Sequence, residues 1–132
     1  MNRAMFIVSA LLVFALAAPA IAQDATKVDP KHYKVEVDNA QVRVLRVTYG
    51  PHEKSVMHSH PNAVAIPLTD VQVKFNLHGG KSQDVSMKAG QAIWTPAGTH
   101  LPENTSDKAM ELVLIELKGA APKAARATDK KK

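Results

Sequence analysis

The sequence predicts an all-β domain, built as a small antiparallel sandwich or barrel. Short runs rich in β-branched residues recur about every 8 to 12 residues, with glycine and proline between them. No stretch after Gln23 has helical periodicity. The runs with the strand pattern are 32–37, 41–49, 63–68, 71–77, 82–88, 91–96 and 110–118.

The segment before these runs has the pattern of a signal peptide. Arg3 gives a positive start, residues 4–18 are apolar, and residues 20–22 form the small-x-small pattern that a signal peptidase reads. An uncleaved membrane anchor is the alternative, because the apolar stretch approaches the ~18 residues that span a bilayer. Pro19 favours cleavage, so we expect a cut after Ala22, a periplasmic or secreted protein, and no integral membrane segment in the mature chain.

The chain contains no cysteine. A lipoprotein anchor and disulfide bonds are therefore excluded, and any metal site must use nitrogen and oxygen ligands.

The net charge of +5 lies mainly outside the expected domain of residues 23–118. The segment 119–132 has five basic residues and one acid, whereas residues 23–118 carry eleven of each sign. A neutral domain argues against nucleic acid as a partner. The tail is rich in alanine and lacks large apolar residues, which predicts disorder; its simplest role is solubility, and weak attraction to anionic surfaces is the alternative.

The first two runs are expected to form adjacent strands. Tyr33, Val35 and Val37 alternate onto one face. In 41–49 the apolar positions change phase after Val44, which predicts either a bulge or a strand buried on both faces.

The middle of the chain predicts a hairpin between the runs 71–77 and 82–88. Gly79 and Gly80 lie in the connecting segment and accept the positive φ angles that tight turns need. The runs 91–96 and 110–118 supply further strands.

The stretch "SVMHSHP" places His58 and His60 two positions apart. In a strand, such residues point to the same face, and Pro61 would end that strand where its missing N–H costs little. Two neutral imidazoles on one face can bind a divalent transition metal if another strand supplies a third ligand. A lone His-x-His pair is also common on a polar surface, so the pair needs further support.

That support comes from two motifs that resemble the cupin family. The first cupin motif starts with glycine, reaches His-x-His, and continues to a glutamate and a second glycine. The second reads roughly Gly-x5-Pro-x-Gly-x2-His-x3-Asn. In this sequence the matching residues are Gly50, His58 and His60, then Gly90, Pro96, Gly98, His100 and Asn104, with one residue missing between Gly98 and His100. The resemblance spans roughly Val35 to Leu117 and implies a single small antiparallel jelly-roll barrel.

In cupins the metal ligands are both histidines of the first motif, the glutamate after them and the histidine of the second motif. The resemblance therefore implies His58, His60 and His100 as ligands of a divalent transition metal, with iron preferred and manganese, zinc, nickel or copper as alternatives. The family glutamate should fall at Val64 or Ala65, and neither residue can bind a metal.

Three outcomes follow from the missing glutamate. The three neutral histidines bind the metal alone, and an anionic or chelating substrate offsets its charge. Alternatively, a carboxylate from Glu53 or Glu103 replaces the missing ligand, although Glu103 is three residues from His100 and should face the other side of a strand. The third outcome is a degenerate site with little or no metal.

Two classes of function remain open at this point. A three-histidine centre with open positions would suit a metal-dependent oxygenase resembling quercetin or diketone dioxygenases. The alternative is a non-catalytic periplasmic cupin that binds a small molecule or a metal. No Gly-x-Ser-x-Gly motif and no cysteine is present, so nucleophilic hydrolysis is disfavoured and no catalytic residue is assigned. The partners expected are a small-molecule ligand or substrate and, through edge strands, a second copy of the chain.

The other candidate residues receive simpler interpretations. His78 should be solvated beside the glycine turn, and His32 has no evident partner. His52 should lie in a surface loop, with a role as a metal ligand or next to the ligands as the alternative. Trp94 and Tyr49 could line a pocket, but an isolated aromatic residue on a strand is more often part of the core.

Overall fold

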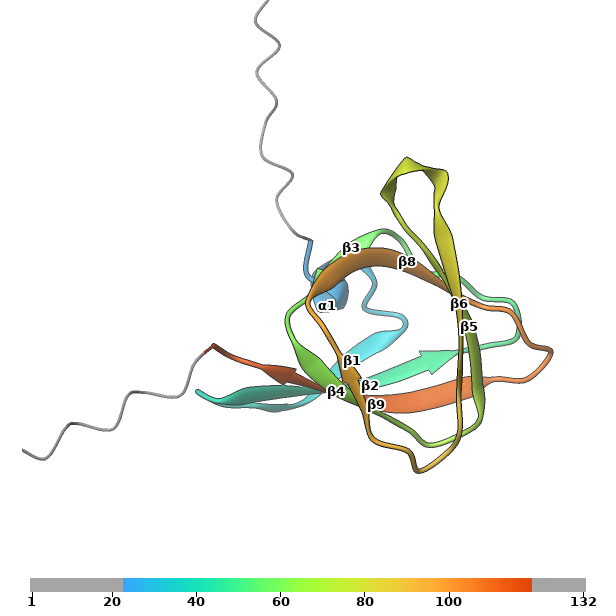
Figure 1. Ribbon diagram of the computed structural model, residues 1–132. Helices are drawn as coiled ribbons and strands as arrows, with labels where there is room; N and C mark the ends of the chain where they lie inside the picture. Colours follow the sequence, from blue (N-terminus) through green and yellow to red (C-terminus); the bar gives the residue numbers. More distant parts are fainter. Residues whose placement is uncertain (1–22, 120–132) are drawn as a thin grey trace, which may run out of the picture.

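The computed structural model describes residues 23–119 and shows an antiparallel jelly-roll barrel (Figure 1). The elements are α1 (Ala25–Val28), β1 (Tyr33–Asp38), β2 (Val42–Tyr49), β3 (His58–His60), β4 (Ala63–Pro67), β5 (Val71–Asn76), η1 (His78–Gly80), β6 (Ser82–Met87), β7 (Ile93–Thr95), β8 (Gly98–Asn104) and β9 (Met110–Leu117). The all-β prediction is confirmed. The expected signal peptide, and the expected tail apart from Gly119, lie outside the described residues.

The strands form two sheets that enclose the core. One has five strands in the order β1-β2-β9-β4-β7, and the other has four in the order β3-β8-β5-β6. Most of the predicted runs became strands, but β8 was not among them, because glycine and proline interrupt its apolar pattern. The sequence also gave no sign of α1, a single turn that Asp24 caps by accepting a hydrogen bond from the backbone N–H of Thr26 at 2.9 Å. Within residues 23–119, no helix is long and apolar enough to cross a membrane.

The phase change in the second run has a different cause from the bulge that we considered. β2 pairs with β9 in unbroken register from Val42 to Tyr49, so it is a regular strand with apolar residues on both faces. The bulge lies in β1, between Val35 and Val37. These two side chains are 48% and 47% exposed, because the tip of the β1–β2 hairpin projects beyond the barrel (Figure 1). The expectation that Tyr33, Val35 and Val37 share one face was wrong for Val37, because the bulge pairs Val35 with Leu45 and Val37 with Val44, which face opposite sides of the sheet.

The hydrophobic core consists of side chains from both sheets that point into the barrel. Its fully buried members include Leu45, Tyr49, Val71 and Ala63. In β4, the alternation puts Ala63 and Ala65 inside the barrel and leaves Val64 half-buried on the outer face.

The glycine turn and the end of the second motif both have structural roles. The predicted hairpin is present between β5 and β6, and both of its glycines adopt positive φ angles, 77° for Gly79 and 74° for Gly80. Asn104 at the end of the second motif is fully buried and donates from Nδ2 to the backbone carbonyls of Gly50, at 2.9 Å, and Lys108, at 2.8 Å. The first residue of one motif is thereby fastened to the last residue of the other.

Candidate metal centre

Pairing between β3 and β8 brings the three predicted histidines together. His58 lies directly opposite His100, and His60 lies opposite Gly98, which has no side chain to fill the space next to the imidazoles. One ring nitrogen from each of the three histidines lies within 4.8 Å of the others. His58 is fully buried and His60 is 9% exposed. Of the described histidines, cysteines and acids, only these three converge in this way.

The hydrogen bonds of His58 and His60 determine which ring nitrogen carries the proton. His58 Nδ1 lies 2.8 Å from the carbonyl oxygen of Val56, which can only accept, so this nitrogen is the donor. His60 Nδ1 lies 2.6 Å from Oε1 of Glu116 and donates to that carboxylate. Both Nε2 atoms therefore carry lone pairs toward the site.

These lone pairs make the site suited to a cation. The two Nε2 atoms are 3.0 Å apart. Two unprotonated nitrogens repel each other at this distance unless a positive charge lies between them. Nitrogens that share a metal at the usual ~2.1 Å bond length, at right angles to each other, are ~3 Å apart. The residues therefore fit a divalent transition metal.

His58 and His100 are held in the neutral form that binds metals. Burial, together with the neighbouring His60, lowers the pKa of His58 to about 4. Burial and the other two histidines lower the pKa of His100 to about 3. At neutral pH neither ring needs to lose a proton before it binds a metal.

The support of His60 by Glu116 was missed by the sequence analysis. Glu116 is 1% exposed, and its Oε2 accepts a hydrogen bond from Arg43 Nε at 2.7 Å. Burial raises the pKa of the Glu116 carboxyl, but hydrogen bonds from His60 and Arg43 outweigh burial and lower it, so the group is a carboxylate. The signal in the sequence was an acid on the inner face of β9, in phase with Leu112 and Leu114.

His100 is held by packing. Its ring stacks on Phe75 of β5, with ring centroids 4.5 Å apart and an angle of 12° between the planes. Within residues 23–119, no hydrogen bond to its ring nitrogens is found, so either tautomer is available to it.

A cavity of about 390 Å³ lies inside the barrel next to His60 and His100. Its lining is mostly apolar and includes Val47, Val71, Phe75, Met87 and Leu112. Tyr33 and Tyr49 also line it, and their hydroxyl groups share one hydrogen bond of 2.7 Å. The cavity therefore suits a small and largely apolar molecule.

The candidate fourth ligands lie elsewhere. The carboxylate of Glu53 is bound by Lys31 Nζ at 2.5 Å, His32 Nε2 at 2.9 Å and the backbone N–H of Gly50 at 2.8 Å. Glu103 lies opposite Lys74 in the β5–β8 pair, and its odd spacing from His100 puts it on the other face of β8. Neither carboxylate joins the three histidines.

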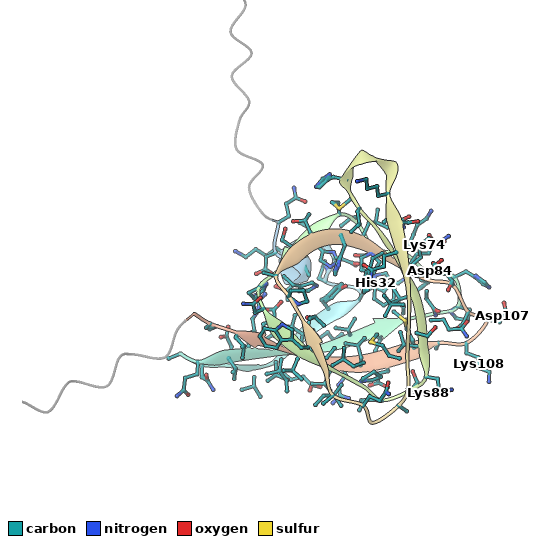
Figure 2. All side chains as sticks on the ribbon, viewed as in Figure 1. His32, Lys74, Asp84, Lys88, Asp107 and Lys108 are labelled. Carbon is teal, nitrogen blue, oxygen red and sulfur yellow. The ribbon has the colours of Figure 1, made fainter. Side chains whose placement is uncertain are left out.

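The remaining candidates are partly as expected. His78 is exposed, and His52 is a surface residue whose Nε2 lies 2.6 Å from Oδ1 of Asp107. The expectation that His32 lacks a partner was wrong, because its Nδ1 lies 2.7 Å from Oδ2 of Asp29 and its ring stacks on Tyr49. Figure 2 shows His32 within the ring of strands, whereas Asp107 lies at the periphery.

The two aromatic residues differ. Tyr49 is in the core as expected, at 1% exposure, but Trp94 is 56% exposed. Trp94 lies opposite Val64 in the β4–β7 pair, so its side chain is on the outer face of the five-stranded sheet.

Comparison with known proteins supports the fold. No family model and no curated protein matches the chain. Among solved structures, a cupin domain from Bordetella pertussis Tohama I is similar, with 27% sequence identity, a TM-score of 0.61, and coverage of 66% of this chain and 92% of that one.

Two further structures share the fold at lower identity. A protein with a double-stranded β-helix domain from Klebsiella pneumoniae has 17% identity, a TM-score of 0.53, and coverage of 68% of this chain and 78% of that one. A cupin family protein from Methanocaldococcus jannaschii has 16% identity, a TM-score of 0.51, and coverage of 67% of this chain and 83% of that one. The barrel and these similarities show that the chain has the cupin fold, and together with the two motifs they support its assignment to the cupin superfamily.

Proposed function

We propose that the protein is an exported cupin that binds a divalent transition metal through His58, His60 and His100 and acts as an oxygenase on a small organic molecule. The observation that carries the proposal is the convergence of three imidazoles beside a largely apolar cavity. Iron is our first choice of metal, because oxygenase chemistry needs a redox-active ion; manganese, zinc, nickel and copper are the alternatives.

The chain's own residues would bind and orient the reactants. The three histidines leave part of a metal's coordination sphere to other ligands, and they carry no negative charge to balance the ion. A substrate that chelates through two oxygens, such as an enol or a diketone, would supply both. When bound, the metal would supply Lewis-acid and redox chemistry. The apolar side chains of the cavity would bind the rest of such a molecule and exclude water from it.

The test begins with metal analysis of the protein as purified from the periplasm. We expect about one divalent transition metal per chain, and oxygen consumption when an enol or diketone is added. His100→Gln should lose the oxygen consumption, and His78→Gln, which changes an exposed histidine, should keep it. Bound metal and bound ligand without any oxygen consumption would favour the alternative, a non-catalytic binding protein. Protein without metal would contradict the oxygenase and leave a small-molecule-binding cupin with a degenerate site.

Export rests on residues 1–22, outside the part of the chain that the structure describes. Sequencing of the amino terminus of the protein recovered from the periplasmic fraction should give Gln23 as the first residue. Recovery of the uncut chain from the membrane fraction would favour the anchor instead.

We also propose a homodimer, formed through the outer face of the five-stranded sheet. One row of apolar residues crosses this face from edge to edge, and its two end members are 47% and 56% exposed. The row is Val37, Val44, Ile115, Val64 and Trp94. The same row on a second copy could pack against it about a two-fold axis.

The mass of the protein in solution tests this dimer. Trp94→Ser should convert a dimer to a monomer by light scattering, and Leu68→Ser, at a side chain that is 45% exposed in the turn after β4, should not. A monomeric parent protein would rule the dimer out.

A further inference from the structure

We propose that Glu116, Arg43 and Asp24 form a positioning chain that fixes the orientation and tautomer of His60, so that its Nε2 faces the metal. This inference rests on the proposed metal site and assigns a role to three residues outside it. None of the three touches the other two histidines through a hydrogen bond.

The contacts run without a gap from the site to the amino-terminal segment. Each carboxylate oxygen of Glu116 accepts a hydrogen bond from a different residue. Oε1 lies 2.6 Å from His60 Nδ1, and Oε2 lies 2.7 Å from Arg43 Nε. A second nitrogen of the guanidinium, Nη2, lies 2.6 Å from the same Oε2. The third, Nη1, lies 2.6 Å from Oδ2 of Asp24. Every nitrogen of the guanidinium therefore faces a carboxylate.

The position of the Arg43–Glu116 ion pair inside the barrel argues against a purely structural role for the positioning chain. Arg43 and Glu116 are directly opposite each other in the β2–β9 pair, on the inner face where Leu45 and Leu114 are buried. A buried ion pair is commonly no more stabilising than apolar side chains of similar volume. A pair of Leu-sized residues would fill this position equally well, but it would leave His60 Nδ1 without an acceptor.

The outer end of the chain also touches the strand that carries the histidines. Asp24 follows Gln23, whose carbonyl oxygen accepts a hydrogen bond from the backbone N–H of Ser59 at 2.8 Å. Ser59 lies between His58 and His60. The amino-terminal segment thus fixes the backbone of β3 directly, and through Arg43 and Glu116 it fixes the ring of His60.

Without an acceptor at Nδ1, the His60 ring would be free to carry its proton on Nε2 or to flip about its Cβ–Cγ bond. In either case a donor N–H, or the wrong ring edge, would face the site. His58 is protected from this by the carbonyl oxygen of Val56, which belongs to the backbone. The carboxylate next to His60 is therefore the support that side-chain substitution can remove.

Two matched double variants test the proposal. Arg43→Met with Glu116→Leu replaces the ion pair with apolar side chains and removes the acceptor. Arg43→Met with Glu116→Gln removes the same charges, but the amide oxygen can still accept from His60 Nδ1. Comparing the two isolates the hydrogen bond, and near-equal melting temperatures of the metal-free proteins show that both variants fold.

Two readouts are needed, metal affinity and the tautomer of His60 by ¹⁵N NMR of metal-free protein. We expect the leucine variant to bind Zn²⁺ or Fe²⁺ about 10- to 100-fold more weakly and to lose the Nδ1–H tautomer. The glutamine variant should keep that tautomer and bind metal more tightly than the leucine variant. A control, Arg46→Met with Glu36→Leu, removes an ion pair with a 2.9 Å contact from the outer face of β2 and should change neither readout.

The outcomes separate this inference from the proposed function. A folded leucine variant with parental metal affinity and an unchanged His60 tautomer would overturn the positioning role. If the parent protein binds no metal, the metal site fails, but the tautomer comparison still decides whether Glu116 positions His60.

Discussion

The two strands that carry the histidines hold them by different means. On β3, the Nδ1 atoms of His58 and His60 bind a backbone carbonyl at 2.8 Å and a buried carboxylate at 2.6 Å. On β8, His100 is held by stacking on Phe75, with ring centroids 4.5 Å apart. Directional hydrogen bonds fix a tautomer, whereas stacking fixes a plane and leaves the ring nitrogens free to exchange the proton.

This difference divides the site into two parts. The β3 side presents two preset lone pairs and should account for most of the metal affinity. His100 lies against the cavity, as His60 does, but no hydrogen bond within the described residues sets its tautomer. The predictions below test this division, from the largest expected effect to the smallest.

Removing the β3 side should abolish metal binding. In His58→Ala with His60→Ala, one imidazole remains, so we expect no bound metal after gel filtration and a lower melting temperature than that of the metal-loaded parent. Elemental analysis and thermal unfolding measure both. The matched control changes two histidines outside the site, His52→Ala with His78→Ala, and should keep the metal. Unchanged metal content in the first variant would show that the ligands are assigned wrongly.

Restoring an acid on the cavity wall should separate metal binding from turnover. Ala65 points into the barrel and lines the same cavity as His100, whereas Val64 points outward. Ala65→Glu should therefore bind metal at least as tightly as the parent and lose oxygen consumption, because the new carboxylate competes with substrate for an open position. Val64→Glu is the outward control and should retain both properties. If the parent carries no metal and Ala65→Glu acquires it, the parent site is degenerate.

The sequence predicted the fold and the three clustered histidines because both follow from local rules. Alternation with a period of two shows the strands, and the same period puts His58 and His60 on one face. His100 follows from a motif in which glycines and proline have fixed positions. β8 itself was missed, since those glycines and its proline remove the alternation by which a strand is recognised.

The residues that hold His60 in place, Glu116 and Arg43, were not predicted, because their contacts depend on the register between strands that are distant in the sequence. Glu116 is 56 positions from His60 and 73 from Arg43, and nothing local joins them. The one available signal was a charged residue in phase with a buried leucine on each of two strands, Arg43 with Leu45 and Glu116 with Leu114. The pairing of β2 with β9 places these two charges opposite each other. The exposure of Trp94 was also beyond the pattern, since it depends on which face of the sheet meets the core.

Weakening the stacking that holds His100 of β8 should have a moderate effect on metal affinity. Phe75→Leu removes the stacked ring but keeps an apolar side chain, and an aromatic pair contributes about 0.5–1.5 kcal/mol. We therefore expect roughly a two- to tenfold loss of metal affinity, measured by competition with a chelator. Phe75→Tyr keeps the ring and should restore most of the affinity. If Phe75→Leu lost as much metal affinity as His58→Ala with His60→Ala, the division of the site would be contradicted. Stacking on His100 would then be as important as the two histidines of β3.

The smallest effect on metal affinity is expected at the outer end of the positioning chain, where Asp24→Asn removes one charge and acts mainly on the stability of the fold. Burial raises the pKa of Asp24, but hydrogen bonds from Arg43 and Thr26 outweigh it and lower the pKa to about 2 from the usual 3.8. The carboxylate therefore stabilises the folded protein fully above about pH 4, and this contribution is lost as the pH falls toward 2. Asparagine can still cap α1, so the variant isolates the charge.

Urea unfolding of metal-free protein at pH 7, 4 and 2.5 measures this contribution. Asp24→Asn should lower the free energy of unfolding by about 2 kcal/mol at pH 7, and its difference from the parent should shrink between pH 4 and 2.5. Asp84→Asn, at an exposed carboxylate on the β5–β6 hairpin (Figure 2), is the control for a charge lost outside the positioning chain. A difference that stays constant with pH would show that the charge of Asp24 does not contribute to the stability of the folded protein. In that case the ion pair with Arg43 would end the positioning chain without strengthening it, and the support of His60 would rest on Arg43 and Glu116.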